Sequence, residues 1–485
     1  MNLLLAINNA GEWIYSSVYF IIILLNIVFT IIIISENRNP VKTIAWISVL
    51  ILLPIVGFIF YLFFGRDQRS KRMISRKSKR KLERLVNDSI SICKEDVNSF
   101  NESTKQLLFL GNKLTRALVT LNNKIEIFTC GKDKYYNLLN DIKNAKSFIH
   151  IQYYIIENDK IGNELKALLM RKAKEGVEVR VLYDDVGCWS WNERNFFEEM
   201  ISVGIEAKPF FKVTFPQLAN KLNYRNHRKI VIIDGYIGYI GGMNVADRYI
   251  SGNRLGVWRD THIKITGEAV RELQSIFMVD WNFTTKELLN EANYFPKERY
   301  EKGGAAIQLL TSGPLDENKS IYLMFTKIIS NAKNRVYIQT PYFLPNSAIT
   351  NTLKVAALSG IDVRIMLPGH SDSKLLQYAS NSYIQEMLKA NIKIFFYQKG
   401  FMHAKTLLVD DEITSIGSTN FDIRSFEQNF EINAFIYDKE FNKRYSDVFM
   451  RDIKDCKRIS LKSWNQRGFF HKTVESLARL FSPVL

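Results

Sequence analysis

One pattern of residues occurs twice in the chain and restricts the possible folds more than any other feature. The first copy consists of His227, Lys229, Asp234, Gly242 and Asn244. The second copy consists of His403, Lys405, Asp410, Ser418 and Asn420, each 176 residues after its counterpart. Equal spacing over the whole pattern requires the same local structure in both places, so we expect an internal duplication.

The segments before each copy also repeat. Residues 147–156 have the pattern of a strand, 162–176 that of an amphipathic helix ending at glycine, and 177–183 that of a second strand. Similar segments recur after residue 331, with Gly360 again ending the helix. Strand, helix and strand in each half predict βαβ units. We therefore expect the α/β class, with a mainly parallel sheet, helices on both faces, and two duplicated halves packed about a pseudo-twofold axis.

The spacing within the pattern indicates phosphate chemistry. A His and a Lys two residues apart on a strand point to the same face, so both can reach one ligand. The glycines let the backbone approach that ligand closely, and the Asn supplies an amide. If the halves face each other, two His, two Lys and two Asn surround one centre. Such a centre suits a phosphodiester, whose negative charge grows on the non-bridging oxygens in the transition state.

This arrangement implies catalysis through a covalent intermediate. One imidazole attacks phosphorus, and the other protonates the leaving oxygen and then serves as base for the incoming alcohol. The pair needs one neutral and one protonated His, so we expect coupled titration and a bell-shaped pH profile. A structural role shared by both copies is the alternative.

Two apolar stretches near the N-terminus predict a transmembrane two-helix hairpin. Residues 14–35 and 44–64 contain no charged residue, and each is close to the roughly 20 residues that a helix needs to cross a bilayer. No Lys or Arg precedes Arg38, so the basic start of a signal peptide is missing. Pro54 and Gly57 should kink the second stretch, and backbone groups freed there need partners on the neighbouring helix.

The charge distribution indicates on which side of the membrane the rest of the chain lies. The formal net charge is +17, and residues 66–84 alone contain ten basic and two acidic residues. Positive segments beside membrane spans stay in the cytoplasm, so we expect this stretch and everything after it there. The same stretch can attract anionic head groups. The charge therefore favours a membrane rather than a nucleic acid as the polyanionic partner.

The duplicated pattern resembles that of the phospholipase D superfamily, whose motifs read HxKx4D followed by GSxN or GGxN. Within this superfamily, the chain is similar to the bacterial cardiolipin synthases over essentially its whole length. The segments that carry the closer similarity are Arg38-Asn39-Pro40, Trp258-Arg259-Asp260 with His262 and Lys264, Thr311-Ser312-Gly313-Pro314, Asn420-Phe421-Asp422-Ile423-Arg424, Asn429-Phe430-Glu431 and residues 478–485.

The resemblance implies a reaction and a role for each motif residue. Two phosphatidylglycerol molecules would give cardiolipin and glycerol through a phosphatidyl-histidine intermediate. His227 would be the nucleophile and His403 the acid and base, by analogy with relatives whose N-terminal His attacks, although the symmetry of the motifs leaves this choice open. The other implied roles are phosphate binding by Lys229 and Lys405, substrate binding by Asn244, Asn420, Gly242 and Ser418, and orientation or charge balance of the histidines by Asp234 and Asp410.

We expect no metal and no other cofactor. The four cysteines show no CxxC spacing, and the two motif lysines already supply the positive charge that a metal would bring. So few cysteines in a chain of 485 residues fit a reducing compartment. They are Cys93, Cys130, Cys188 and Cys456.

These predictions divide the chain into four parts. They are a transmembrane hairpin at 1–65, a basic juxtamembrane linker at 66–108, a first phospholipase D-type half at 109–300, and a second half at 301–485 with a C-terminal amphipathic segment. That segment fits either an interfacial helix or a helix packed on the core. The oligomeric state stays open.

Three other functions are compatible with the motif. They are a hydrolase that releases phosphatidic acid, a membrane-tethered nuclease, and a membrane scaffold without activity. The hairpin argues against the nuclease, because an active site tethered beside the bilayer suits a substrate that lies in it. The expected partners are therefore phosphatidylglycerol and other anionic phospholipids of the bacterial cell membrane, and not nucleic acid.

Overall fold

The computed structural model describes residues 2–35, 40–61, 99–189, 193–212, 224–289, 292–296 and 303–482. The chain forms two units, one of Met1–Ser70 with Val213–Asn223 and one of Lys71–Lys212 with Tyr224–Leu485. The basic stretch 66–84, predicted to lie at the membrane surface, falls outside the described residues.

Among the described residues of the N-terminal unit, one helix is long and apolar enough to cross a membrane. The helices of this unit are α1 (Asn2–Ser35), α2 (Pro40–Leu52) and α3 (Pro54–Phe60). Within α1, Ser16–Ser35 has the length and hydropathy of a membrane span. The 13 residues of α2 rise only about 20 Å, short of the roughly 30 Å hydrocarbon core. The described residues therefore do not confirm the predicted two-helix hairpin, because the second apolar stretch forms two short helices.

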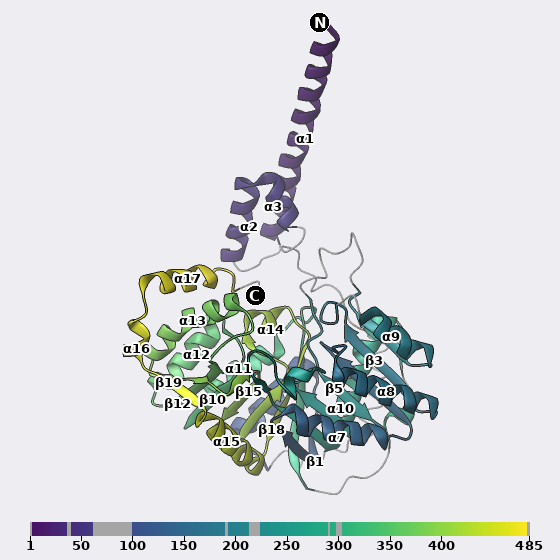
Figure 1. Ribbon diagram of the computed structural model, residues 1–485. Helices are drawn as coiled ribbons and strands as arrows, with labels where there is room; N and C mark the ends of the chain where they lie inside the picture. Colours follow the sequence, from purple (N-terminus) through teal and green to yellow (C-terminus); the bar gives the residue numbers. More distant parts are fainter. Residues whose placement is uncertain are drawn as a thin grey trace. The chain divides into compact units, whose positions relative to one another are not determined.

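The second apolar stretch breaks completely at Pro54, where we expected a kink. Pro54 has no backbone N–H, and Leu53 before it leaves the helical conformation with φ −134°. Helix α3 then lies beside α2 (Figure 1). A Cβ on Gly57 would lie 2.6 Å from the carbonyl oxygen of Val49, so this close approach requires glycine. Asn26 of α1 donates a hydrogen bond to the Pro54 carbonyl at 3.1 Å, the kind of support expected from a neighbouring helix.

A 15-stranded sheet forms the centre of the second unit. Its strands in the first half are β1 (Val119–Phe128), β2 (Phe148–Tyr153), β3 (Glu178–Asp184), β4 (Glu206–Phe210), β5 (Ile230–Ile233), β6 (Ile237–Gly241) and β8 (His262–Gly267). Its strands in the second half are β9 (Ala305–Ser312), β10 (Arg335–Gln339), β12 (Asp362–Pro368), β13 (Lys393–Tyr397), β15 (Thr406–Val409), β16 (Ile413–Gly417), β18 (Glu431–Tyr437) and β19 (Cys456–Ile459). Two small sheets pair β7 (Val257–Arg259) with β14 (Gly400–Met402) and β11 (Phe343–Leu344) with β17 (Phe421–Asp422).

The strand order repeats on the two sides of the central pair β1 and β9. From β1 outward the order is β8, β6, β5, β2, β3 and β4, and from β9 outward it is β18, β16, β15, β10, β12, β13 and β19. Figure 1 shows the first half in blue and teal and the second in green and yellow, joined through these two strands. The repeated order confirms the internal duplication.

The βαβ pattern predicted a mainly parallel sheet, and this prediction is wrong. In the described residues, four of its fourteen strand pairings are parallel, and these lie toward its two edges. Each motif strand instead continues through a tight turn into an antiparallel partner, β5 into β6 and β15 into β16. The turns begin at Asp234 and Asp410, which adopt left-handed φ values of 53° and 51°.

Helices cover both faces of the sheet, as predicted. The α-helices described in this unit are α6 (Glu102–Thr115), α7 (Gly131–Lys143), α8 (Lys160–Lys174), α9 (Glu193–Ser202), α10 (Ala269–Thr285), α11 (Ser320–Ser330), α12 (Ser347–Leu358), α13 (Lys374–Lys389), α14 (Ile423–Glu427), α15 (Lys439–Ile453), α16 (Leu461–Asn465) and α17 (Phe469–Arg479). Side chains of α10 and α15 share one apolar core with strand residues of both halves, such as Ile232 and Leu408. On the other face, α7 to α9 pack on the first half and α11 to α13 on the second.

Candidate active site

The two motif histidines are each fixed to the backbone of the opposite half. The N–H of His227 donates to the carbonyl of Phe430 at 2.9 Å, and that of His403 donates to the carbonyl of Arg259 at 2.7 Å. His403 directly follows β14, which pairs in parallel with β7 of the first half. An isolated parallel β-bridge between Asn226 and Phe430 likewise joins the residue before His227 to the second half. The two halves thus meet at the motif histidines.

Each imidazole also contacts a carboxylate of the opposite half. Nδ1 of His227 lies 3.0 Å from Oε1 of Glu431, and Nδ1 of His403 lies 2.5 Å from Oδ2 of Asp260. Both carboxylates are fully buried. A carboxylate that accepts from Nδ1–H leaves Nε2 as the unprotonated nitrogen of a neutral imidazole. That tautomer can attack phosphorus.

The two carboxylates expected to orient the histidines contact backbone N–H groups in the structure. Asp234 accepts hydrogen bonds from the backbone N–H groups of residues 146, 147 and 148 at 2.7–2.9 Å. Asp410 accepts from the N–H groups of residues 333, 334 and 335 at 2.7–3.2 Å. Asp tolerates the left-handed turn conformation, and its carboxylate ties the turn to the start of β2 or β10. These two residues hold the motif strands in place.

The residues that the sequence interpretation missed are Asp260 and Glu431. Both lie in segments that carry the family resemblance, but their types differ and they are 171 residues apart rather than 176. A search for a repeat with the 176-residue offset therefore does not match Asp260 with Glu431. Their positions in the sequence also do not indicate that each contacts the histidine of the other half.

The two motif lysines lie beside the histidines, and both are buried. Nζ of Lys229 donates to the carbonyl of His227 at 2.6 Å. Nζ of Lys405 lies 2.8 Å from Nδ1 of His403 and 3.6 Å from Oδ2 of Asp260. The charge of Lys405 also acts on His227 and on Lys229, so the structure brings the two motifs together around one centre.

Burial makes both histidines weak bases. It lowers the pKa of His227 to about 4, because the charge of Glu431 only partly offsets the loss of solvent. Burial, together with the charge of Lys405, lowers the pKa of His403 to about 3. Both imidazoles are therefore neutral near pH 7 while the site holds no anion.

Burial raises the pKa of the two carboxylates, but the cations beside them lower it by more. Burial raises the pKa of Asp260, and Lys405 and His403 lower it below its ordinary value. The pKa of Glu431 is also lowered, because His227 and Lys229 outweigh burial. Burial lowers the pKa of Lys405 to about 8, despite the charge of Asp260. The site thus keeps two carboxylates ionised behind the histidines.

The predicted substrate-binding residues differ between the two halves. The side chain of Ser418 donates to Glu431, whereas a Cβ on Gly242 would lie 2.2 Å from Oδ1 of Asp260. The Ser418 hydroxyl thus hydrogen-bonds the longer Glu431 side chain, whereas Gly242 leaves room for the shorter Asp260 side chain.

The two motif asparagines also lie in different surroundings. The Oδ1 of Asn244 accepts from the N–H of Ile155 at 3.2 Å, and its Nδ2 donates to Tyr249 at 3.2 Å. The Oδ1 of Asn420 is buried with no hydrogen-bond partner among the described residues.

Aromatic rings surround the histidines. The ring of Tyr154 lies 5.1 Å from that of His227, and the rings of Trp258 and Tyr249 lie 5.0 and 5.8 Å from that of His403. Apolar walls keep water from the reacting centre and strengthen its electrostatic interactions.

No group of three or more His, Cys, Asp or Glu side chains with the geometry of a metal site occurs in the part of the chain that the structure describes. The charges of Lys229 and Lys405 act on both motif histidines.

Two protein families match the chain. The family described as cardiolipin synthase, PLD-like domain matches residues 138–281 and 325–453, which include both copies of the motif. The family described as phospholipase D-nuclease N-terminal matches residues 24–66.

Curated relatives are similar over nearly the full length. The cardiolipin synthase of Alkalihalophilus pseudofirmus is 40% identical over 98% of this chain and 95% of the relative. The major cardiolipin synthase ClsA of Bacillus subtilis is 41% identical over 97% of this chain and 98% of the relative. Among solved structures, the phosphatidylserine synthase of Haemophilus influenzae has a TM-score of 0.61 at 15% identity, covering 80% of this chain and 100% of that chain. This last likeness concerns the fold alone.

Proposed function

The chain belongs to the cardiolipin synthase family of phospholipase D-like proteins, and from this premise we propose that it joins two phosphatidylglycerol molecules into cardiolipin and releases glycerol. The observation that carries the proposal is the pair of histidines, each held at Nδ1 by a buried carboxylate of the other half. Two such imidazoles around one centre provide a nucleophile and a proton carrier for phosphatidyl transfer.

In the first step, Nε2 of His227 attacks the phosphorus of one phosphatidylglycerol. The bond from phosphorus to the glycerol head group breaks, and the released oxygen takes a proton from His403. In the second step, the hydroxyl of another phosphatidylglycerol gives its proton to His403. The resulting oxygen displaces His227 from phosphorus, which restores both imidazoles. The choice of His227 as the nucleophile is part of the proposal, because His403 also has a carboxylate at its Nδ1.

His403 has to carry a proton in the first step, although burial and Lys405 disfavour it without a ligand. A bound phosphodiester anion favours the protonated form of His403, because its charge opposes that of Lys405 and Lys229. Substrate binding would thus prepare the acid. The same two lysines would bind the non-bridging oxygens, where charge increases in the transition state. Among the predicted substrate-binding residues, Asn420 has a buried carbonyl oxygen without a partner in the described part of the chain, and it can accept from a lipid hydroxyl.

The pseudo-twofold relation of the halves is supported by the repeated strand order and by the reciprocal histidine–carboxylate pairs. We further propose a multi-pass membrane protein in which residues 14–35 and 44–64 both lie in the bilayer. Exposed apolar side chains on α1, α2 and α3 support this placement, as does the bond from Asn26 to the break at Pro54. The basic residues of 66–84 would lie on the cytoplasmic side, with the catalytic halves.

Product analysis tests the proposed function. The full chain is reconstituted in liposomes containing phosphatidylglycerol, with and without a chelator, and the lipids are separated. Cardiolipin with one glycerol per cardiolipin is the expected result, and the chelator should not change it. Phosphatidic acid without cardiolipin would identify a hydrolase instead. His227→Ala and His403→Ala should each abolish transfer, and normal turnover in either variant would refute the paired-histidine mechanism.

A further inference from the structure

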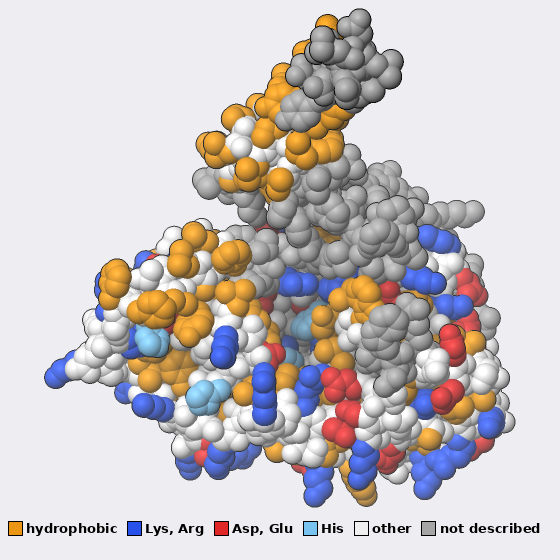
Figure 2. Space-filling view, turned by 45° about the horizontal axis from the view of Figure 1, so that its top comes forward, with side chains coloured by type: hydrophobic (Ala, Val, Ile, Leu, Met, Phe, Trp, Pro, Cys, Tyr) orange, Lys and Arg blue, Asp and Glu red, His pale blue; other side chains and the backbone are white. Residues whose placement is uncertain are grey.

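Helix α17 carries its large apolar side chains on the outside of the protein. Phe469 and Phe470 are 85% and 76% exposed, and Leu480, directly after the helix, is 74% exposed. Leu477 and Phe481 are more than half exposed. We call these five side chains the outer face of α17. Figure 2 shows hydrophobic side chains gathered over this end of the second half.

The opposite side of α17 carries the charges and packs on the protein. Glu475 is only 4% exposed and forms an ion pair with Arg467, whose guanidinium stacks 3.4 Å above the ring of Trp464. Ala478 is buried on the same side. A helix on the surface of a soluble protein has the reverse arrangement, with apolar residues inward and charges outward.

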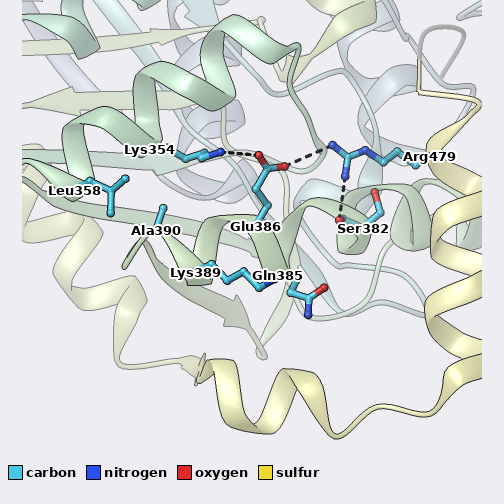
Figure 3. Close-up of a pocket in the computed structure, with 8 residues that line it drawn as sticks. All are labelled: Lys354, Leu358, Ser382, Gln385, Glu386, Lys389, Ala390 and Arg479. Atoms are coloured by element: carbon cyan, nitrogen blue, oxygen red, sulfur yellow. Dashed lines mark hydrogen bonds and ion pairs between the residues drawn. The ribbon is translucent and has the colours of Figure 1, made fainter.

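Polar contacts with α13 fix this orientation. Nη2 of Arg479 lies 3.6 Å from Oε2 of Glu386, and Nη1 donates to the carbonyl of Ser382 at 3.5 Å. The guanidinium also lies 4.1 Å from the ring centre of Tyr383. Figure 3 shows Arg479 and Lys354 converging on Glu386 in a cleft between α12, α13 and α17. The outer face is therefore presented by a folded, anchored helix.

The charges beside the outer face are positive. Between Leu461 and Ser482 the chain has four basic residues and a single acidic one, Glu475, which is turned inward. The basic residues are Lys462, Arg467, Lys472 and Arg479. An apolar helix face rich in Phe and Leu with basic residues at its border binds the interface of an anionic bilayer.

We propose that α17 docks the catalytic unit on an anionic lipid surface, with its outer face inserted among the lipid chains. A second copy of this chain is the less suitable occupant, because pairing two outer faces would bring two segments of net positive charge together. The proposal goes beyond phosphatidyl transfer, since it concerns how the catalytic unit contacts the membrane whichever lipid reacts. Under this proposal α17 is both an interfacial helix and a helix packed on the core.

Fluorescence of the full chain in vesicles tests the insertion. An environment-sensitive fluorescent amino acid replaces Phe470 in one variant and Tyr136, which is 77% exposed on α7, in the control. The vesicles contain one-third anionic phospholipid and a spin-labelled lipid. We expect lipid-borne quenching at position 470 to be at least threefold stronger than at position 136. Equal quenching at both positions, with position 470 open to aqueous iodide, would overturn the proposal. This measurement needs no turnover, so it stands apart from a failure of the proposed function.

A pair of substitutions provides the second test. Phe469→Ser with Phe470→Ser should lower transfer on vesicles at least fivefold relative to transfer in detergent micelles. The matched control, Tyr136→Ser with Phe109→Ser, removes two other exposed rings and should leave this ratio unchanged. An unchanged ratio in the α17 variant would contradict the proposal. Conversion of a dimer into a monomer by the α17 substitutions would also overturn it, since a second copy would then be the occupant.

Discussion

Glu431 holds Nδ1 of His227 at 3.0 Å across the boundary between the two halves. Asp260 holds Nδ1 of His403 at 2.5 Å in the reverse direction. Neither half therefore contains a complete histidine–carboxylate pair. Assembly of the two halves and assembly of the candidate active site are the same event, because the backbone bonds at Phe430 and Arg259 fix both histidines at that boundary.

Glu431→Gln should lower phosphatidyl transfer by about 100-fold, the upper end of what loss of an orienting partner usually costs. Glutamine keeps the size of the side chain but no longer has a charge to stabilise a protonated or phosphorylated imidazole. The measurement is kcat in liposomes, together with a thermal unfolding curve. A full loss of folding would leave kcat uninterpretable, so Glu431→Asp, which keeps the charge, serves as the second variant and should recover part of the activity. Full activity in Glu431→Gln would contradict the assignment.

Asp410→Ala should lower the free energy of unfolding and largely retain kcat, in contrast to Glu431→Gln. The Asp410 carboxylate accepts backbone N–H groups at the start of β10 and does not contact either histidine. Its removal leaves those donors without their partner, at a cost of about 1–3 kcal/mol in the free energy of unfolding. Unfolding midpoints and kcat at low temperature separate the two effects. A catalytic role would instead appear as a kcat loss comparable to that of Glu431→Gln at an unchanged midpoint.

Phosphate binding and transfer should both weaken as the pH rises above about 8. Lys405 carries its charge below its pKa of about 8 and loses it above, so the attraction for the phosphodiester falls as the pH passes through that value. The affinity for inorganic phosphate, measured by calorimetry in detergent between pH 6 and 10, reports this directly. In Lys405→Arg the guanidinium stays charged, so the part of the decline near pH 8 that Lys405 causes should disappear, although burial also lowers the pKa of Lys229. The same decline in that variant would assign it to another group.

Much of the candidate site could be predicted from the sequence because the repeat is local. His227 and Lys229 occupy one short segment, and the constant 176-residue offset shows that the second copy folds alike. The carboxylate partners could not be predicted in this way, since Asp260 and Glu431 differ in type and act on the opposite half. Such pairing depends on tertiary contacts that no residue spacing encodes.

The fold prediction was limited by a similar cause. The sequence pattern indicates the βαβ segments but not the antiparallel strands, because Asp234 fits a chemical role in the motif as well as the first position of a turn. Asp followed by Gly235 is a hairpin signal, and a left-handed φ at both positions agrees with it. In the N-terminal unit, Pro54 was expected to bend a helix, yet the loss of its N–H ends that helix altogether.

Gly242 and Ser418 occupy equivalent positions in the two motifs, and their difference predicts that exchanging the two residue types has unequal effects in the two halves. Gly242→Ser would place a Cβ where Oδ1 of Asp260 now lies, 2.2 Å away, so Asp260 must move from His403. Transfer should then fall by about 100-fold. Ser418→Gly removes the hydrogen bonds of the hydroxyl to Glu431 and to the backbone of Ile432, but Glu431 stays in contact with His227, so a loss of about tenfold or less is expected. Both variants are assayed for kcat in liposomes, and the NMR signals of the two imidazoles are compared. Because the substitutions exchange the same two residue types between equivalent positions, equal losses in both variants would show that the carboxylates do not control the histidines differently in the two halves.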